Sequence, residues 1–175
     1  MNFKTFPELR TERLILRELV DSDQSAIFSL RSDERVNKYL DRPKPKSIDE
    51  AKAFITKIKT GIKNHNNFYW AICMKHNPDL IGTICLWNFS EDNTTAEIGY
   101  ELNPLFQNLG YMNEAIAFVL KYSFNTIGLK KIEAYTHKDN IKSTQILKKN
   151  KFSLDKDRKN EENNNLIFIL TGYKQ

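Results

Sequence analysis

A glycine turn between a strand pattern and a helical pattern is the feature that most restricts how this chain can fold. The residues at 94–102 predict a strand, and the turn formers after it end at Gly110. From there apolar residues recur at helical spacing up to Gly128, and a short strand follows at 131–136. A strand, a helix and a strand in this order predict a crossover, so the two strands are expected to be parallel neighbours.

Backbone chemistry makes the turn at residues 107–112 a candidate binding site. The first N–H groups of a helix have no partner within the helix, and the helix macrodipole adds positive potential at the same end. The turn contains few obstructive side chains, and it lies at a carboxyl end of the predicted sheet. The sequence therefore predicts an anion site at this turn.

The rest of the chain predicts further strands and helices around this unit. Strand patterns occur at 13–19, 68–74, 80–87, 152–156 and 166–173, with a turn at 76–79. Helices are expected after the cap at 21–23, after the Ser47/Glu50 capping box and at 140–150. The three consecutive strands between 68 and 102 predict an antiparallel meander.

Length and charge limit the class of protein. The 175 residues suit one domain, 1–175, and 27 basic against 22 acidic residues give 27 − 22 = +5. The basic residues are scattered, which favours a solvated surface over a nucleic-acid-binding one. No segment approaches the about 18 apolar residues of a membrane span, and no signal peptide is evident.

The cysteines and histidines indicate neither a disulfide nor a metal site. Cys73 and Cys85 would not lie opposite each other in a hairpin, so both are interpreted as buried free thiols in a reducing compartment. Together with the missing signal peptide, this predicts a cytoplasmic protein. His65, His76 and His137 lack metal-ligand spacing, and no Ser/His/Asp arrangement suggests a hydrolase.

Four short motifs occur in a characteristic order: TERLILR at 11–17, AEIGY at 96–100, GYMNEA at 110–115 and NIKS at 140–143. Together they resemble the GNAT superfamily of N-acetyltransferases, in its RimJ/RimL-like branch of ribosomal-protein N-terminal acetyltransferases, over nearly the whole chain. The resemblance implies a GNAT-type α/β (α+β) fold. Its sheet would be mixed and mostly antiparallel, with about six to seven strands, a parallel pair at the acetyl-CoA site and about four flanking helices.

The resemblance also implies acetyl-CoA as co-substrate. The phosphate-binding turn of the family, Gln/Arg-x-x-Gly-x-Gly/Ala, is matched by Gln107 and Gly110. Met112 departs at the last position, where a compatible backbone with its side chain turned away suffices. The predicted CoA contacts are Gln107, Asn108, Leu109, Gly110, Tyr111 and Met112 in the turn, Tyr100 and Leu102 before it, and Asn140 and Ser143 after it.

Glu97 and Glu101 are the candidate bases. Strand alternation places them on one face with Gly99 between them. An acceptor ammonium has a pKa of about 8 at a chain terminus or about 10.4 on lysine, so a carboxylate acting through water is a plausible proton acceptor. Glu97 is the first choice and Glu101 the second; the alternative is that both are solvent-facing strand residues.

Asn140 and Ser143 fit an Asn-x-x-Ser element of the family. The resemblance implies that Asn140 contacts the pantetheine arm and that Ser143 protonates or stabilises the departing thiolate. The alternative is helix capping, in which the Asn140 side chain accepts from the Ser143 N–H. Many relatives outside the branch carry a general-acid Tyr where this chain has Leu147. The family as a whole usually has a Gly where this chain has Lys151.

These observations predict an N-acetyltransferase that transfers acetyl from acetyl-CoA to a primary amine by direct attack in a ternary complex. No cysteine sits where a covalent intermediate would need it. The expected acceptor is a protein N-terminal amine of the ribosomal-protein type; the alternatives are a small-molecule amine such as a polyamine, amino acid or antibiotic. Residues 42–46 and 159–165 would shape that choice.

Other interpretations of the chain remain open. One is a non-catalytic CoA-binding sensor module, and another is binding to RNA or ribosomes through the positive surface. The chain is expected to act as a monomer or homodimer, without a metal, a membrane or direct nucleic acid. Three aromatic residues either line an acceptor pocket or belong to the core: Trp87, Tyr39 and Phe89. His137 is a further candidate for contact with the substrate.

Overall fold

An eight-stranded sheet in the order β1-β2-β3-β4-β5-β6-β8-β7 forms the centre of the computed structural model, which describes residues 6–158 and 164–172. The strands are β1 (Leu9–Arg10), β2 (Leu14–Glu18), β3 (Phe68–Met74), β4 (Asn77–Trp87), β5 (Thr95–Leu102), β6 (Lys131–His137), β7 (Ser153–Leu154) and β8 (Asn165–Thr171). The seven predicted strands are present, and the two-residue β1 is the eighth.

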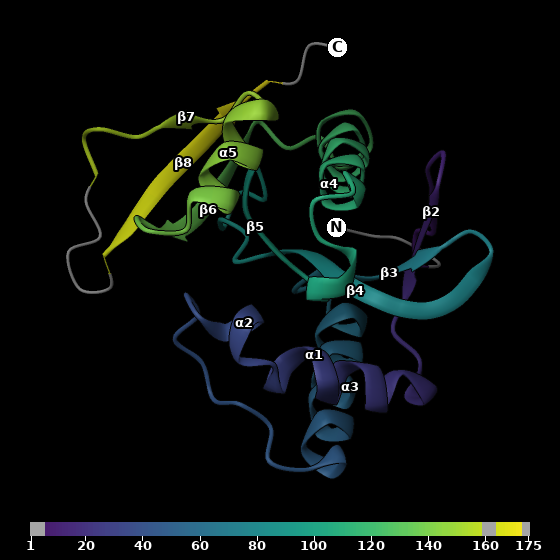
Figure 1. Cartoon of the computed structure of the whole chain (residues 1–175). Helices are drawn as coiled ribbons and strands as arrows, with labels where there is room; N and C mark the ends of the chain where they lie inside the picture. The colour runs from purple at the N-terminus through teal and green to yellow at the C-terminus, as the bar shows by residue number, and fades with distance from the viewer. Residues whose placement is uncertain (1–5, 159–163, 173–175) are drawn as a thin grey trace.

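Helices cover both faces of this sheet (Figure 1). They are α1 (Gln24–Ser32), α2 (Glu34–Asn37), α3 (Ile48–Lys63), α4 (Tyr111–Tyr122) and α5 (Ile141–Lys149), with short 3-10 helices at Asp21–Asp23 and Pro104–Phe106 and a π-helical segment at Ser123–Ile127. The predicted mixed α/β fold is thus confirmed.

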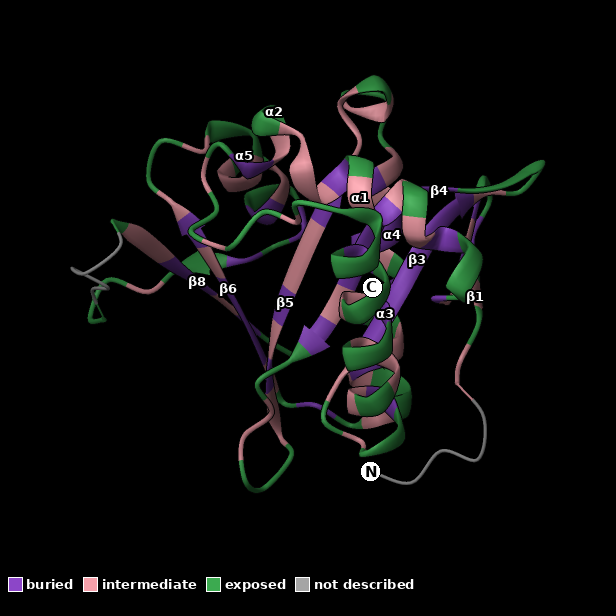
Figure 2. Cartoon of the chain, turned by 90° about the horizontal axis from the view of Figure 1, so that it is seen from below, coloured by how far each residue is buried: buried purple, intermediate pink, exposed green. Residues whose placement is uncertain are grey.

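Two apolar cores lie on the two faces because the strands alternate. Along β3, Trp70 and Ile72 face the core that includes α4, whereas Tyr69, Ala71 and Cys73 face the core formed with α1 and α3. The central strands are therefore buried on both sides, as the purple segments of β3 and β4 show (Figure 2).

The parallel pair is short, and this shortness creates an opening in the sheet. β5 and β6 pair only from Thr95 to Glu97, opposite Lys131 to Glu133. β5 then continues to Leu102 beside β4, while the rest of β6 pairs with β8. The two strands meet at one end and diverge toward their carboxyl ends (Figure 2).

Local details differ from the predictions at two places. The β3–β4 turn is tighter than the predicted 76–79 turn, because Met74 already pairs with Asn77. Asp23 does not cap α1 through its side chain; its carboxylate instead accepts two hydrogen bonds from the Arg17 guanidinium, both at 2.8 Å.

Both thiols are free, as predicted, but Cys73 is buried whereas the Cys85 residue is only partly buried. The two cysteines lie opposite different residues of the hairpin. Cys73 lies opposite Leu80, and Cys85 lies opposite Tyr69. Burial raises the pKa of Cys73 to about 11 and that of Cys85 to about 12. Neither thiol is therefore activated as a nucleophile near neutral pH.

Lys151 is expected to be a strained residue that glycine would relieve. It follows the last residue of α5, Lys149, and the C-cap Asn150, and its φ of 69° is left-handed, whereas Asn150 keeps a φ of −88°. Lys151→Gly should stabilise the fold by about 1 kcal/mol, since a side chain in this conformation costs about that much. The expected rise in Tm is about 2–4 °C.

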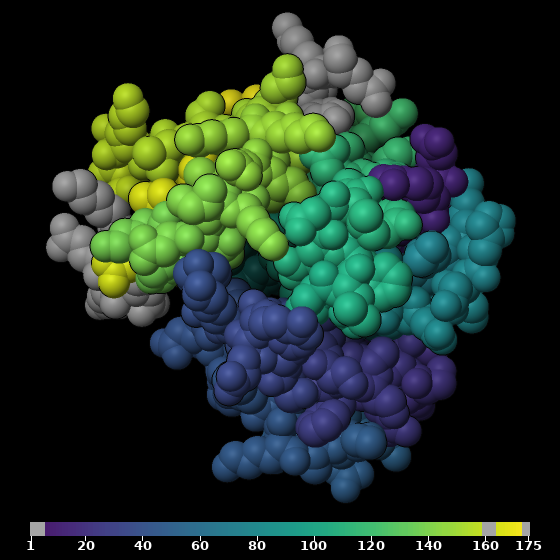
Figure 3. Space-filling model, in the orientation of Figure 1, coloured from purple at the N-terminus to yellow at the C-terminus, as the bar shows by residue number. Residues whose placement is uncertain are grey.

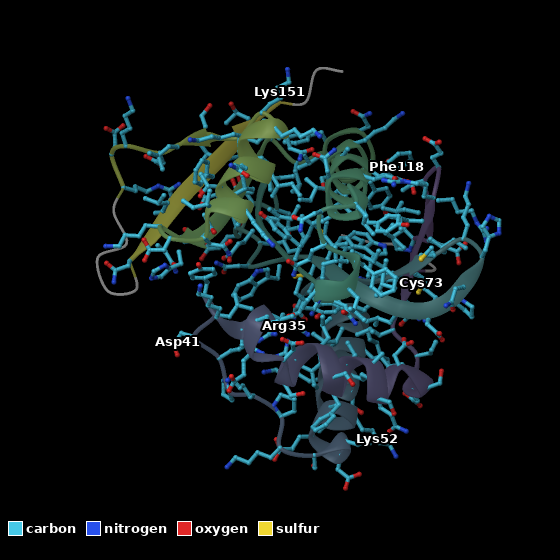
Figure 4. The ribbon with its side chains drawn as sticks, viewed as in Figure 1. Arg35, Asp41, Lys52, Cys73, Phe118 and Lys151 are labelled. Carbon is cyan, nitrogen blue, oxygen red and sulfur yellow. The ribbon has the colours of Figure 1, made fainter. Side chains whose placement is uncertain are left out.

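Thermal unfolding of Lys151→Gly and Lys148→Gly tests this expectation. Lys151 lies just beyond the end of α5 (Figure 4), and Lys148 lies within the helix. Glycine at Lys148 should lower stability by about 1 kcal/mol. A Tm that falls in both variants would contradict the strain at Lys151.

Candidate active site

The carboxyl ends of β5 and β6 bring two helix N-termini to one opening. Because β5 and β6 are parallel, the chain leaves the sheet at the same edge after each of them. After β5 the chain enters α4 at Gly110, and after β6 it enters α5 at Asn140. Figure 3 shows a hollow here, between the blue, yellow-green and blue-green segments.

The predicted phosphate turn presents unpartnered backbone donors to this opening. Asn108 and Gly110 have φ values of 63° and 83°, so the chain reverses sharply before α4. The first N–H with a helical acceptor is that of Glu114, 3.1 Å from the Gly110 carbonyl oxygen. Within the described residues, the N–H groups from Asn108 to Asn113 donate to no acceptor. This geometry suits an anion.

Side chains of the turn take different positions. The Leu109 side chain is exposed, whereas that of Met112 is buried in the core, as the departure from the family pattern requires. The Gln107 side chain donates to the Leu102 carbonyl at 3.1 Å and accepts from Lys142 at 3.2 Å. Gln107 therefore ties the end of β5 to α5, a role that its motif position did not reveal.

A clamp from the start of β2 holds the turn from outside. Arg13 Nε donates to Glu114 at 2.7 Å, its Nη1 donates to the Leu109 carbonyl at 3.0 Å, and its guanidinium lies over the Tyr111 ring. The Thr11 hydroxyl also donates to Glu114. The sequence motif contains Arg13, but its spacing does not indicate the partner Glu114, 101 residues along the chain.

Tyr100 and Ser143 meet across the opening. The Tyr100 hydroxyl of β5 lies 2.9 Å from the Ser143 hydroxyl of α5, and burial raises the pKa of Tyr100 to about 12. The predicted cap is also present, since the Asn140 side chain accepts from the Ser143 N–H at 3.2 Å. These three predicted residues are thus brought together.

Glu97 lies where the two strands part. Partial burial raises its pKa to about 7, helped by repulsion from Glu133 and opposed by hydrogen bonds with Asn88 and Trp87. Hydrogen bonds from Arg158, Lys131 and Tyr135 hold the pKa of Glu133 at about 2 despite its burial. Glu97 can therefore exchange a proton near neutral pH.

Glu101 has a different environment on the same strand face. The register with β4 is unbroken from Glu97 to Leu102, so the predicted alternation holds. The Glu101 carboxylate is buried, lies 2.5 Å from Arg42 Nη2 and 3.7 Å from Arg31 Nη1, and accepts from the Thr83 hydroxyl. It is therefore an ion-paired group and not a solvent-facing one.

The aromatic candidates divide between the core and the surface. Phe89 packs against Phe68 in the core, whereas Trp87 is exposed. Tyr39 stacks on His137 with their ring centroids 5.6 Å apart, which joins the segment after α2 to the end of β6. Among the described residues, no group of three or more potential ligands could hold a metal, and no helix is long and apolar enough to cross a membrane.

The split parallel pair, the donor-rich turn and the second helix start together correspond to a known family. A model described as the acetyltransferase (GNAT) domain matches residues 13–153. The chain belongs to the GNAT acetyltransferases. It is 35% identical over 144 residues to YoaA of Bacillus subtilis, an N-acetyltransferase described as uncharacterized, with 82% of this chain and 81% of that protein covered.

Solved GNAT structures share the fold at low identity. RimL, a ribosomal L7/L12 α-N-protein acetyltransferase solved with coenzyme A, matches with a TM-score of 0.79, 16% identity and coverage of 94% of this chain and 98% of that one. FdhC, described as a nucleotide-linked sugar GNAT, matches with a TM-score of 0.79, 21% identity and coverage of 95% and 91%. This chain is thus an acetyl-CoA-dependent N-acetyltransferase, and its family implies an amine acceptor.

Proposed function

We propose that this enzyme acetylates a primary amine by direct attack in a ternary complex, with acetyl-CoA held in the opening between β5 and β6. The observation that carries the proposal is the end of parallel pairing at Glu97 and Glu133. Glu97 lies at that point, and beyond it the two strands diverge toward the turn at 107–112 and toward the start of α5, which carries Ser143. The free N–H groups of the turn would hold the pyrophosphate.

Proton transfer is divided between two residues in this proposal. Glu97 accepts a proton from the acceptor ammonium, through water, and the amine nitrogen then bonds to the acetyl carbon as the carbon–sulfur bond breaks. Ser143 gives a proton to the departing thiolate. The second proton, which the nitrogen loses once it has bonded to the acetyl carbon, replaces it through water and Tyr100. A cysteine-linked intermediate fits poorly because both thiols have raised pKa values. Glu101 fits poorly as base because its buried carboxylate is already paired with Arg31 and Arg42.

The acceptor we propose is a protein N-terminal amine, with a small-molecule amine as the alternative. RimL acts on a ribosomal protein, but that neighbour supports the shared fold and not the acceptor of this chain. Arg42, the first residue of the segment 42–46, pairs with Glu101 of β5, whereas residues 159–163 of the second predicted loop lie outside the described residues. A cytoplasmic location and a monomeric or homodimeric state remain predictions.

An acetyl-transfer assay across an amine panel tests the proposal. The panel holds short peptides with free amino termini, matched peptides with blocked termini, a polyamine, amino acids and an aminoglycoside. We expect CoA release and a mass increase of one acetyl group on free-terminus peptides alone. Tight CoA binding with no transfer to any amine would indicate the sensor module and overturn the proposal.

Ser143→Ala is expected to lower kcat by about 10–100-fold while leaving the Kd for CoA within a factor of about three, because one proton donor to the leaving thiolate is lost. Tyr100→Phe should have a smaller effect on kcat, since the serine hydroxyl stays in place. Single-turnover rates and calorimetric CoA titrations measure the two quantities. An unchanged kcat in Ser143→Ala would remove the residue from the mechanism.

A further inference from the structure

A buried ion cluster joins α1, the segment that follows α2, and β5. Arg31 comes from the end of α1, Arg42 from the segment after α2, and Glu101 from β5. All three side chains are largely buried, with exposed fractions of 15%, 19% and 6%. Asn37 accepts from Arg42 Nε at 2.8 Å, which fixes that guanidinium.

The cluster holds more positive than negative charge. Two guanidinium groups share one carboxylate, and the Arg31 contact at 3.7 Å is longer than a hydrogen bond. Burial lowers the pKa of Arg31, and repulsion from Arg42 acts in the same direction against the attraction of Glu101. Arg31 also lies over the Phe54 ring, 3.9 Å from its centroid, but among the described residues Glu101 is the only carboxylate in an ion pair with these two guanidinium groups.

The tighter contact uses one oxygen of the carboxylate. Arg42 Nη2 and Glu101 Oε2 lie 2.5 Å apart and form an ion pair. An additional anionic group would supply acceptor oxygens for both guanidinium groups.

The position of the cluster relates it to the reaction. Glu101 and Glu97 share a strand face and are four residues apart, or about 13 Å along an extended strand. The blue segment that carries Arg31 and Arg42 forms one border of the hollow at the diverging strands (Figure 3). A carboxylate two or three residues from the acceptor amine would span this distance, at about 3.3–3.6 Å per extended residue.

We propose that Arg31 and Arg42 bind a carboxylate of the acceptor, so that the enzyme prefers amines carrying an acidic group near the amine. This inference rests on the proposed acetyl transfer to an amine and specifies the acceptor. The carboxylate belongs either to an Asp or Glu side chain near a protein N-terminus or to a small amino acid. Glu101 holds the two arginines in place.

Matched acceptors test the preference. One arm compares peptides with Asp or Asn at the second and third positions, and the other compares free amino acids with their amides. In the arm that contains the true acceptor, the wild-type kcat/KM should be about 10–100-fold higher for the carboxylate than for the amide. This is the effect expected from one charge-assisted hydrogen bond. Equal values in both arms would overturn the inference while leaving acetyl transfer itself intact.

Arginine variants separate a binding role from a folding role, because the quantity measured is the ratio of kcat/KM for the carboxylate acceptor to kcat/KM for its amide. Arg31→Gln should reduce the carboxylate-to-amide ratio of kcat/KM to near one, and Arg31→Lys should retain part of it. The control is Arg35→Gln: Arg35 is exposed and pairs with Asp33 at 2.6 Å (Figure 4). A purely structural role for Arg31 would lower both rates equally and leave the ratio unchanged, which would contradict the proposal.

Discussion

Glu97→Gln is expected to lower kcat/KM for acetyl transfer by about 10²–10⁴-fold at about pH 8, the contribution of a well-placed general base. The amide has nearly the shape of the carboxylate but accepts no proton at this pH. The Kd for CoA should stay near its wild-type value, because the turn at 107–112 binds the phosphates. Steady-state kinetics with a free-terminus peptide and a CoA titration measure both quantities.

The pH dependence follows from the raised pKa of Glu97, about 7. Below this pH the carboxylate is protonated and cannot act as a base, so wild-type kcat/KM should fall as pH falls through about 7. Glu97→Gln should lack this inflection, and its deficit should be largest above neutrality. With the unperturbed pKa of a glutamate, the loss of activity in Glu97→Gln would instead be expected at low pH, where the amine is protonated but the carboxylate is still ionised.

A glutamate outside the site provides the control for this prediction. Glu91 lies in the exposed turn between β4 and β5, so Glu91→Gln should keep the wild-type profile. If Glu97→Gln also kept the inflection near pH 7, the titrating group would be another residue. Glu97 would then have no part in proton removal.

Gly110→Ala is expected to raise the Kd for CoA by at least about tenfold, through displacement of the backbone donors of the turn. Gly110 has a φ of 83°, and an added Cβ would lie 3.2 Å from Arg13 Nη2, the residue that clamps the turn. The methyl group therefore strains the backbone and presses on the clamp. Calorimetric titration with CoA measures the effect.

Gly128→Ala is the matched control because Gly128 has nearly the same φ, 84°, and an added Cβ there meets nothing within 4 Å. Both variants should lose about 1 kcal/mol of stability from the left-handed backbone. Only Gly110→Ala should lose CoA affinity. Equal CoA affinities in the two variants would contradict the assignment of the phosphate turn.

Much of this arrangement follows from local sequence. Gly110, Gly128 and the Asn140 cap are short-range signals, since each depends on the conformation of a few neighbouring residues. The parallel pairing of β5 and β6 follows from the strand-helix-strand order. The predicted contact between the Asn140 side chain and the Ser143 N–H is confirmed by the structure.

The remaining features depend on contacts between distant residues. The Arg13–Glu114 clamp joins β2 to α4, and the ion pairs of Glu101 depend on where the segment after α2 lies. The raised pKa of Glu97 requires burial and the neighbouring charge of Glu133, neither of which is visible in a strand pattern. Pattern reasoning could name both glutamates, but only the fold separates their environments.

A crystal structure with acetyl-CoA bound would test the account most directly. We expect pyrophosphate oxygens within hydrogen-bond distance of the backbone N–H groups between Asn108 and Asn113, and the thioester between the diverging ends of β5 and β6, near Ser143. Acetyl-CoA bound elsewhere, or with its pyrophosphate away from this turn, would contradict it.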